Sequence, residues 1–192
     1  MRYCVLYPET KNVHLIKDVG MIAYKLYKLY GVDSFVACYK NGKYDYLKNE
    51  VKGLKIDFIE KKHRHLINIF LYLKKNAAKI DVLQIFHITF NSVIYAFIYK
   101  FFNKNGIIFL KLDCSNSLLK RLNHLNFIEK FFLNLYLKKT DIIGVEQNNI
   151  YCRLKKLLYK FKDKLMHIPN GLDFDKDIFK DKVNFEDKEN IV

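Results

Sequence analysis

Two charged residues, Lys111 and Asp113, interrupt an apolar run that has the pattern of a buried β-strand (106–113). A charged side chain is costly to bury unless it is paired or used in a site. Because the two residues are two apart on a strand, their side chains point to the same face of the sheet. The sequence leaves two interpretations open: a structural Lys–Asp ion pair, or a ligand-binding cleft with Asp113 as its carboxylate.

Polar residues also stand near the carboxyl ends of two other predicted strands. His87 lies near the end of the strand predicted over 81–88, and Glu146 ends the strand predicted over 141–146. In an open α/β sheet, ligands bind at the carboxyl ends of the strands. We therefore expect both side chains at the edge of a cleft. For His87 a second interpretation remains open: a strand-end histidine with a structural role, satisfied by hydrogen bonds.

The first predicted strand (3–7) and the helix after it have the arrangement of a phosphate-binding βα unit. Asp18 fits the N-cap of this helix, Gly20 lies near its start, and Gly31 ends it. The free N–H groups at a helix N-terminus can bind an anion. Gly20 is therefore a candidate substrate-binding residue, or simply a glycine tolerated at the start of a helix.

Histidine and cysteine spacing favours structural roles over metal binding. His63 and His65 lie two apart, but no Cys, Asp or Glu converges on them in sequence, so we expect a solvated basic loop. No metal and no cofactor is expected. The cysteines lie in or beside apolar segments without metal or redox spacing, which predicts buried thiols in a reducing, cytoplasmic setting. These cysteines are Cys4, Cys38, Cys114 and Cys152.

The remaining sequence alternates between strand and helix patterns. Further strands are predicted over 34–39, 54–59 and 164–168, and further helices over 66–77, 92–103, 116–125, 127–139 and 150–161. Such alternation with short connections is typical of βαβ units. The sequence therefore predicts an α/β, Rossmann-like fold: a mainly parallel, twisted sheet with helices on both faces.

Two apolar segments raise the question of membrane contact. Residues 85–102 are interrupted by polar residues such as His87 and Lys100, so they predict a buried strand leading into a buried helix and not a transmembrane helix. The helix predicted over 127–139 is apolar on a wide face. We expect that face in the core, not at a membrane.

The formal net charge of this 192-residue chain is +14. Of its 34 basic residues, 4 are Arg and hence 30 are Lys. A basic surface attracts anionic lipid, nucleotide phosphates or nucleic acid. Because proteins that read nucleic-acid sequence depend on Arg for bidentate base contacts, the scarcity of Arg favours a membrane surface and makes nucleic acid unlikely as a partner.

Residues 167–173, His-Ile-Pro-Asn-Gly-Leu-Asp, predict a sharp exit from a strand, since Pro169 gives no N–H to a sheet and Asn170-Gly171 tolerates positive φ. This stretch resembles the apolar-Pro-Asn-Gly-apolar-Asp motif of group 1 (family 4-like) glycosyltransferases of the GT-B fold. In that family the motif ends the N-terminal Rossmann-like domain. The resemblance implies an acceptor-side domain over 1–174, followed over 175–192 by a charged interdomain linker and the start of a truncated, donor-binding C-terminal domain.

Two strands extend the resemblance. Asp81 and His87 resemble the family's Asp-apolar-apolar-His-apolar-His strand, with His87 displaced by one position. Lys111-Leu112-Asp113 is similar to a Lys-x-Asp variant in which Asp113 takes the place of a histidine that faces the donor sugar. The resemblance implies that Asp113 is catalytic and that six residues bind substrate: His87, Lys111, Glu146, Gly20, Asn170 and Gly171.

The function implied by the resemblance is transfer of a sugar from a nucleotide-diphosphate donor to a hydroxyl acceptor, with retention of configuration and without a required metal. A glycan or lipid-linked acceptor in cell-surface polysaccharide or glycolipid synthesis is expected, with the protein cytoplasmic and peripheral on the inner face of the cell membrane. The Glu-x7-Glu motif of the donor-binding domain is absent, so this chain alone is expected to be inactive. The alternative is a non-catalytic, basic Rossmann-like module that binds nucleic acid or a protein partner.

Overall fold

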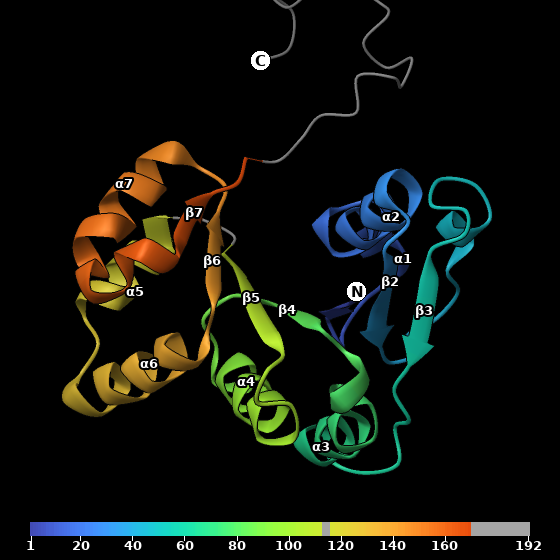
Figure 1. Cartoon of the computed structure of the whole chain (residues 1–192), viewed down its shortest axis with the longest axis horizontal. Coiled ribbons are helices and arrows are strands. Elements are labelled where there is room, and N and C mark those ends of the chain that lie inside the picture. Colours follow the sequence, from blue (N-terminus) through green and yellow to red (C-terminus); the bar gives the residue numbers. More distant parts are fainter. Residues whose placement is uncertain (113–115, 170–192) are drawn as a thin grey trace, which may run out of the picture.

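The computed structural model describes residues 1–112 and 116–169 (Figure 1). All seven predicted strands form, and they pair in parallel in one sheet of order β3-β2-β1-β4-β5-β6-β7. The predicted α/β, Rossmann-like fold is therefore confirmed. The strands are β1 (Arg2–Leu6), β2 (Asp33–Cys38), β3 (Lys55–Phe58), β4 (Val82–Phe86), β5 (Ile107–Leu112), β6 (Ile142–Val145) and β7 (Leu165–His167).

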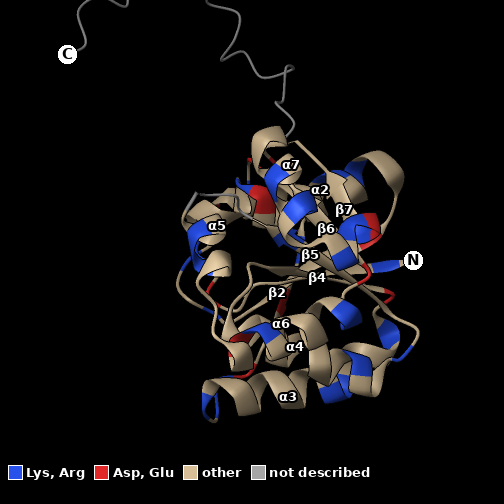
Figure 2. Cartoon of the chain, turned by 90° about the vertical axis from the view of Figure 1, so that its left-hand side faces the viewer, with Lys and Arg blue, Asp and Glu red and all other residues tan. Residues whose placement is uncertain are grey.

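Helices cover both faces of the sheet. The α-helices are α1 (Asn12–Leu15), α2 (Asp18–Tyr30), α3 (His65–Asn76), α4 (Phe90–Phe102), α5 (Asn116–Asn123), α6 (Phe127–Lys139) and α7 (Asn148–Leu157). Short 3₁₀ helices are η1 (Asp45–Leu47), η2 (Ala77–Lys79) and η3 (Tyr159–Lys164). Figures 1 and 2 show α3, α4 and α6 on one face and α2 on the other.

Alternation along each strand divides the core into two layers. In β1, Cys4 and Leu6 join the core that also holds the buried side chains of α3 and α4. Tyr3 and Val5 point the other way and pack with α2. Because both faces are buried, the central strands read as continuous apolar runs, which explains why the sequence predicts them well.

Local signals fix the ends of several helices. Gly31 ends α2 in the left-handed conformation, with φ of 63°. Thr89 caps α4 through a reciprocal pair of hydrogen bonds with Ser92, so the helix begins before the predicted residue 92. Asn126 and Glu129 form the same arrangement at the start of α6. The prediction of Asp18 as an N-cap is wrong by one residue, since Lys17 holds that position and Asp18 is the first helical residue.

The predicted burial of the α6 apolar face is wrong. Phe127 and Phe131 are 85% and 53% exposed, while Tyr136 and Leu137 form the buried side of the helix. The helical period shows which residues share a face but not which face is covered. Residues 85–102 are a buried strand followed by a helix, as expected, but the outer side of α4 is exposed at Phe90. In the described part of the chain, no helix is both long and apolar enough to cross a membrane.

The cysteine prediction holds only in part. Cys4 and Cys38 are buried free thiols, whereas Cys152 is exposed on α7. Cys114 lies outside the described residues. The same is true of three predicted site residues, Asp113, Asn170 and Gly171, and of the predicted domain boundary near residue 174.

Candidate functional site

A charged cluster lies at the carboxyl edge of the sheet, centred on Lys111 of β5. The Lys111 side chain is 3% exposed, and its Nζ lies 2.5 Å from Oδ2 of Asp18 at the start of α2. Lys111 Nζ also donates a hydrogen bond to Oε1 of Glu146, which directly follows β6. Three distant parts of the chain therefore meet at one ammonium, and we call them the Asp18–Lys111–Glu146 cluster.

The two carboxylates of the cluster differ in their affinity for protons. Burial alone would raise the pKa of Asp18, but the Lys111 ammonium and a hydrogen bond with Glu146 outweigh burial and hold that pKa below its usual value. At Glu146, burial is the largest cause and raises the pKa. The nearby Asp18 raises it further, and Lys111 only partly opposes the shift. Asp18 is therefore the ionised partner of Lys111, while Glu146 is the group that more readily takes up a proton.

His87 lies beside this cluster, just after β4. Its backbone has φ of 60°, in the left-handed region that side chains other than glycine seldom adopt. Its N–H donates to the carbonyl oxygen of Lys111, at 3.0 Å. The left-handed backbone turns the chain out of β4 at His87. This residue borders two hollows in the surface.

A hollow of about 520 Å³ opens on one side of His87. Polar side chains from four segments line it, including Glu9 after β1, His65 at the start of α3 and Asn91 in α4. We call it the His65–His87 hollow. Because imidazole, carboxylate and amide groups line it together with apolar residues such as Ile85, it suits a ligand rich in hydroxyl groups.

His65 corrects the prediction of a solvated basic loop. Its Nδ1 lies 3.0 Å from the hydroxyl oxygen of Tyr39, and its Nε2 is hydrogen-bonded to the Tyr95 hydroxyl. These two contacts fix the plane of the imidazole at the wall of the hollow. The sequence signal that was missed is a histidine at the first position of the helix that follows a strand, which places it at the carboxyl edge.

A second hollow, of about 390 Å³, lies on the other side of His87 and Thr89. Arg121 of α5 borders it and donates from Nη2 to the carbonyl oxygen of Ile88, at 2.6 Å. A guanidinium at the wall of a hollow can also attract an anionic group. The carboxyl edge thus offers two adjoining spaces that share His87.

Gly20 has a packing reason for being glycine. A Cβ atom placed on it would lie 2.1 Å from the backbone oxygen of Leu15, where α1 meets α2. The residue is buried two positions after Asp18. The hollows described above do not include Gly20, and its contact with substrate stays a prediction.

The structure brings part of the predicted site together. Lys111 and Glu146 are in direct contact, and His87 is hydrogen-bonded to the Lys111 backbone. Asp18 was predicted only as a helix cap, yet it is a full member of the cluster. Within residues 1–112 and 116–169, no group of three His, Cys, Asp or Glu side chains is arranged to hold a metal ion.

Comparison with known proteins shows the fold but not the activity. No protein-family model matches the sequence, and no curated protein matches it. Among solved structures, the chain is similar to the lipopolysaccharide outer core galactosyltransferase WaaB in its apo form, with a TM-score of 0.55 and 13% identity over 90% of this chain and 46% of WaaB.

A proposed UDP-N-acetylglucosamine 2-epimerase from Listeria monocytogenes is also similar, with a TM-score of 0.50 and 14% identity over 86% of this chain. The chain spans about half the length of both proteins, 46% and 44% respectively. The fold is therefore that of one Rossmann-like half of a GT-B-type structure.

Proposed function

We propose that this chain forms the N-terminal, acceptor-side domain of a glycosyltransferase that moves a sugar from a nucleotide-diphosphate donor to a hydroxyl acceptor. The observation that carries the proposal is the meeting of charged and polar groups at the carboxyl edge of a parallel sheet, where such folds bind ligands. Lys111 and Glu146 are in contact there, and the His87 N–H is hydrogen-bonded to the Lys111 carbonyl oxygen. The likeness to a galactosyltransferase supports the proposal at the level of fold.

In this proposal the His65–His87 hollow receives the acceptor. The exposed carboxylate of Glu9 and amide of Asn91 can hydrogen-bond to sugar hydroxyls, and apolar lining residues such as Ile85 can contact the face of a sugar ring. In the same proposal donor and acceptor meet near Lys111 of β5 and Glu146, which directly follows the neighbouring strand β6. Asp113 follows Lys111 by two residues and remains the proposed catalytic carboxylate on the ground of its position in the sequence.

The donor is held mainly by a second domain in this proposal. The chain spans less than half of the similar solved structures, and a closed cleft between two domains is needed to exclude water from the reaction. We therefore expect this chain alone to lack transfer activity and to bind nucleotide sugars weakly. Retention of configuration, independence of metal, and a polysaccharide or glycolipid acceptor belong to the same proposal.

Titration calorimetry with UDP- and GDP-sugars tests whether a second domain holds the donor. We expect binding when the donor-binding domain is joined to this chain and little or none with the chain alone. Strong binding or sugar transfer by the chain alone would contradict the proposal. In the joined protein, His87→Ala should lower transfer at least tenfold, because a group that contacts substrate is lost, whereas Lys155→Ala at an exposed position of α7 should not.

The reaction products separate this proposal from its alternatives. A glycosyltransferase forms a new glycosidic bond and needs an acceptor, whereas a 2-epimerase, the activity proposed for the Listeria protein, would change a UDP-sugar at C2 without one. The non-catalytic alternative rests on the formal charge of +14. It predicts no turnover of any nucleotide sugar by the joined protein and salt-sensitive binding to nucleic acid.

A further inference from the structure

The outer sides of α4 and α6 form one exposed apolar surface. Six phenylalanines contribute to it: Phe90, Phe97 and Phe101 on α4, and Phe127, Phe131 and Phe132 on α6. We call this surface the phenylalanine face. Phe90, Phe101 and Phe127 are 77%, 74% and 85% exposed, so their rings lie almost entirely in solvent. Single exposed apolar residues are common, but a contiguous apolar patch marks an interaction surface.

The two helices are joined by an apolar hollow of about 570 Å³. Phe90 and Phe97 border it from α4, and Phe132 borders it from α6. The inner side of α4 is buried against the sheet, at Tyr95 and Tyr99 for example. Helix α4 is therefore apolar on both its inner and outer sides, a pattern that calls for cover on the outside as well.

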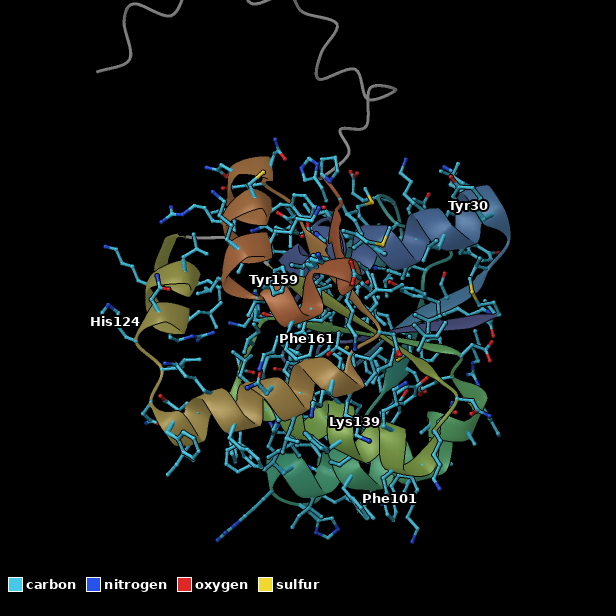
Figure 3. The ribbon with its side chains drawn as sticks, turned by 60° about the vertical axis from the view of Figure 1, so that its left-hand side comes forward. Tyr30, Phe101, His124, Lys139, Tyr159 and Phe161 are labelled. Atoms are coloured by element: carbon cyan, nitrogen blue, oxygen red, sulfur yellow. The ribbon has the colours of Figure 1, made fainter. Side chains whose placement is uncertain are left out.

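Lysines lie on the helices that carry this surface. Together α3, α4 and α6 contain six lysines and one glutamate. One of these lysines, Lys100, is 15% exposed and paired with Asp141, so the other five supply the exposed positive charge. Lys138 and Lys139 follow Phe131 and Phe132 by seven residues, so each lies on the same side of α6 as one of these rings. In Figure 3, Lys139 and Phe101 lie on the side of the molecule formed by α3, α4 and α6, whereas Tyr30 lies on the opposite side, on α2. The glutamate, Glu129, is engaged in capping α6.

We propose that the phenylalanine face docks on the surface of an anionic lipid bilayer. The aromatic rings would enter the boundary between headgroups and acyl chains, and Lys138 and Lys139 would contact lipid phosphates. A second copy of the chain fits this face poorly, because α3, α4 and α6 offer the lysines of a facing copy a single carboxylate, that of Glu129. This proposal concerns a surface outside the carboxyl-edge site, and it holds whatever reaction the protein catalyses.

Vesicle flotation tests the apolar part of the proposal. The chain is mixed with vesicles of phosphatidylcholine alone or with one quarter phosphatidylglycerol, at low and high salt. We expect binding only to the anionic vesicles and its loss at high salt. Phe127→Ser combined with Phe131→Ser should weaken binding at least tenfold, whereas the matched control of Leu29→Ser with Tyr30→Ser, two exposed positions at the end of α2, should change it less than about twofold.

Charge reversal tests the basic part. Lys138→Glu with Lys139→Glu should weaken binding about thirtyfold or more, given the attraction of each lysine to an anionic surface. Lys155→Glu with Lys156→Glu makes the same change at two exposed positions in the last turn of α7 and should have a much smaller effect. Equal losses in both pairs would overturn the proposal. So would sedimentation that shows a dimer dissociated by the phenylalanine changes, with no binding to vesicles.

Discussion

Replacing Lys111 by Met removes the cation of the Asp18–Lys111–Glu146 cluster and keeps a long, unbranched side chain. Breaking a buried ion pair by removing one partner costs about 3–5 kcal/mol, because the remaining charge stays buried. Asp18 is 34% exposed and solvent screens part of this cost. We therefore expect Lys111→Met to lower the unfolding free energy by about 2 kcal/mol at pH 7.5, which lowers Tm by about 4–8 °C in a chain of this size.

The loss should depend on pH in a defined direction. Glu146 has a raised pKa in the folded protein, so it binds a proton more readily there than in the unfolded chain. Its burial therefore costs stability as the pH rises above the unfolded value of about 4.3. Without Lys111, that cost grows at pH 7.5 and is relieved on acidification, because protonated Glu146 carries no charge. The effect of Lys111→Met should thus be clearly smaller at pH 5 than at pH 7.5.

Urea and thermal unfolding at both pH values measure this effect. Lys155→Met at an exposed position of α7 is the matched control and should change Tm by less than about 1 °C. Adding Glu146→Gln to Lys111→Met removes one of the two carboxylates and should restore part of the loss at pH 7.5. A Lys111→Met loss that equals the control, or that is the same at both pH values, would refute the charge balance described here.

Substitution or labelling at three further positions tests the ion cluster, the packing of α1 on α2 and the burial of the thiols. Asp18→Asn should flatten the fall in stability between about pH 5 and pH 2. Ionised Asp18 stabilises the fold above its unfolded pKa of about 3.9, and this stabilisation is lost as the pH falls through the lower pKa of the folded protein. An unchanged dependence of the urea midpoint on pH would contradict this prediction. Gly20→Ala should lower the unfolding free energy by about 2 kcal/mol, because its Cβ would meet the Leu15 backbone, and a urea midpoint equal to wild type would show that α1 yields freely. Cys152 should react with a thiol reagent in the folded protein, whereas Cys4, whose pKa burial raises, should react only on unfolding; the count of fast-reacting thiols in mass spectrometry checks both.

Much of the sheet could be predicted because its strands are buried on both faces. A parallel strand such as β4 reads as an uninterrupted apolar run, and short connections limit the possible topologies. The positions of Lys111 and Glu146 at the carboxyl edge follow from the same reasoning, since each comes at the end of a predicted strand. The sequence alone therefore predicts which edge of the sheet carries the candidate site.

The partners within the site were not accessible in the same way. Asp18 and Lys111 are 93 residues apart, and nothing in the local pattern of either residue names the other. Their contact depends on how α2 packs over the sheet, which a single sequence does not reveal. The sequence predicts Asp113 as a possible ion-pair partner of Lys111. That pairing stays a prediction because Asp113 lies outside the described residues.

The outer surface of α6 was missed for a related reason. The helical period groups Phe127 and Phe131 on one side of the helix, and a soluble domain normally turns such a side inward. Here α6 packs through Tyr136 and Leu137 on a different side. The wide apolar stripe was thus assigned as a whole to the core, although only its margin is used there.

Two features at the carboxyl edge cost stability where they meet. A buried ion cluster rarely stabilises a protein more than apolar residues of the same volume would. The left-handed backbone at His87 adds a cost of about 1 kcal/mol. The two features are joined by the hydrogen bond from the His87 N–H, just after β4, to the carbonyl oxygen of Lys111 on the adjacent strand β5. Because local rules are broken mainly where function requires it, this concentration of costs supports our proposal that the carboxyl edge binds a ligand, independently of any family resemblance.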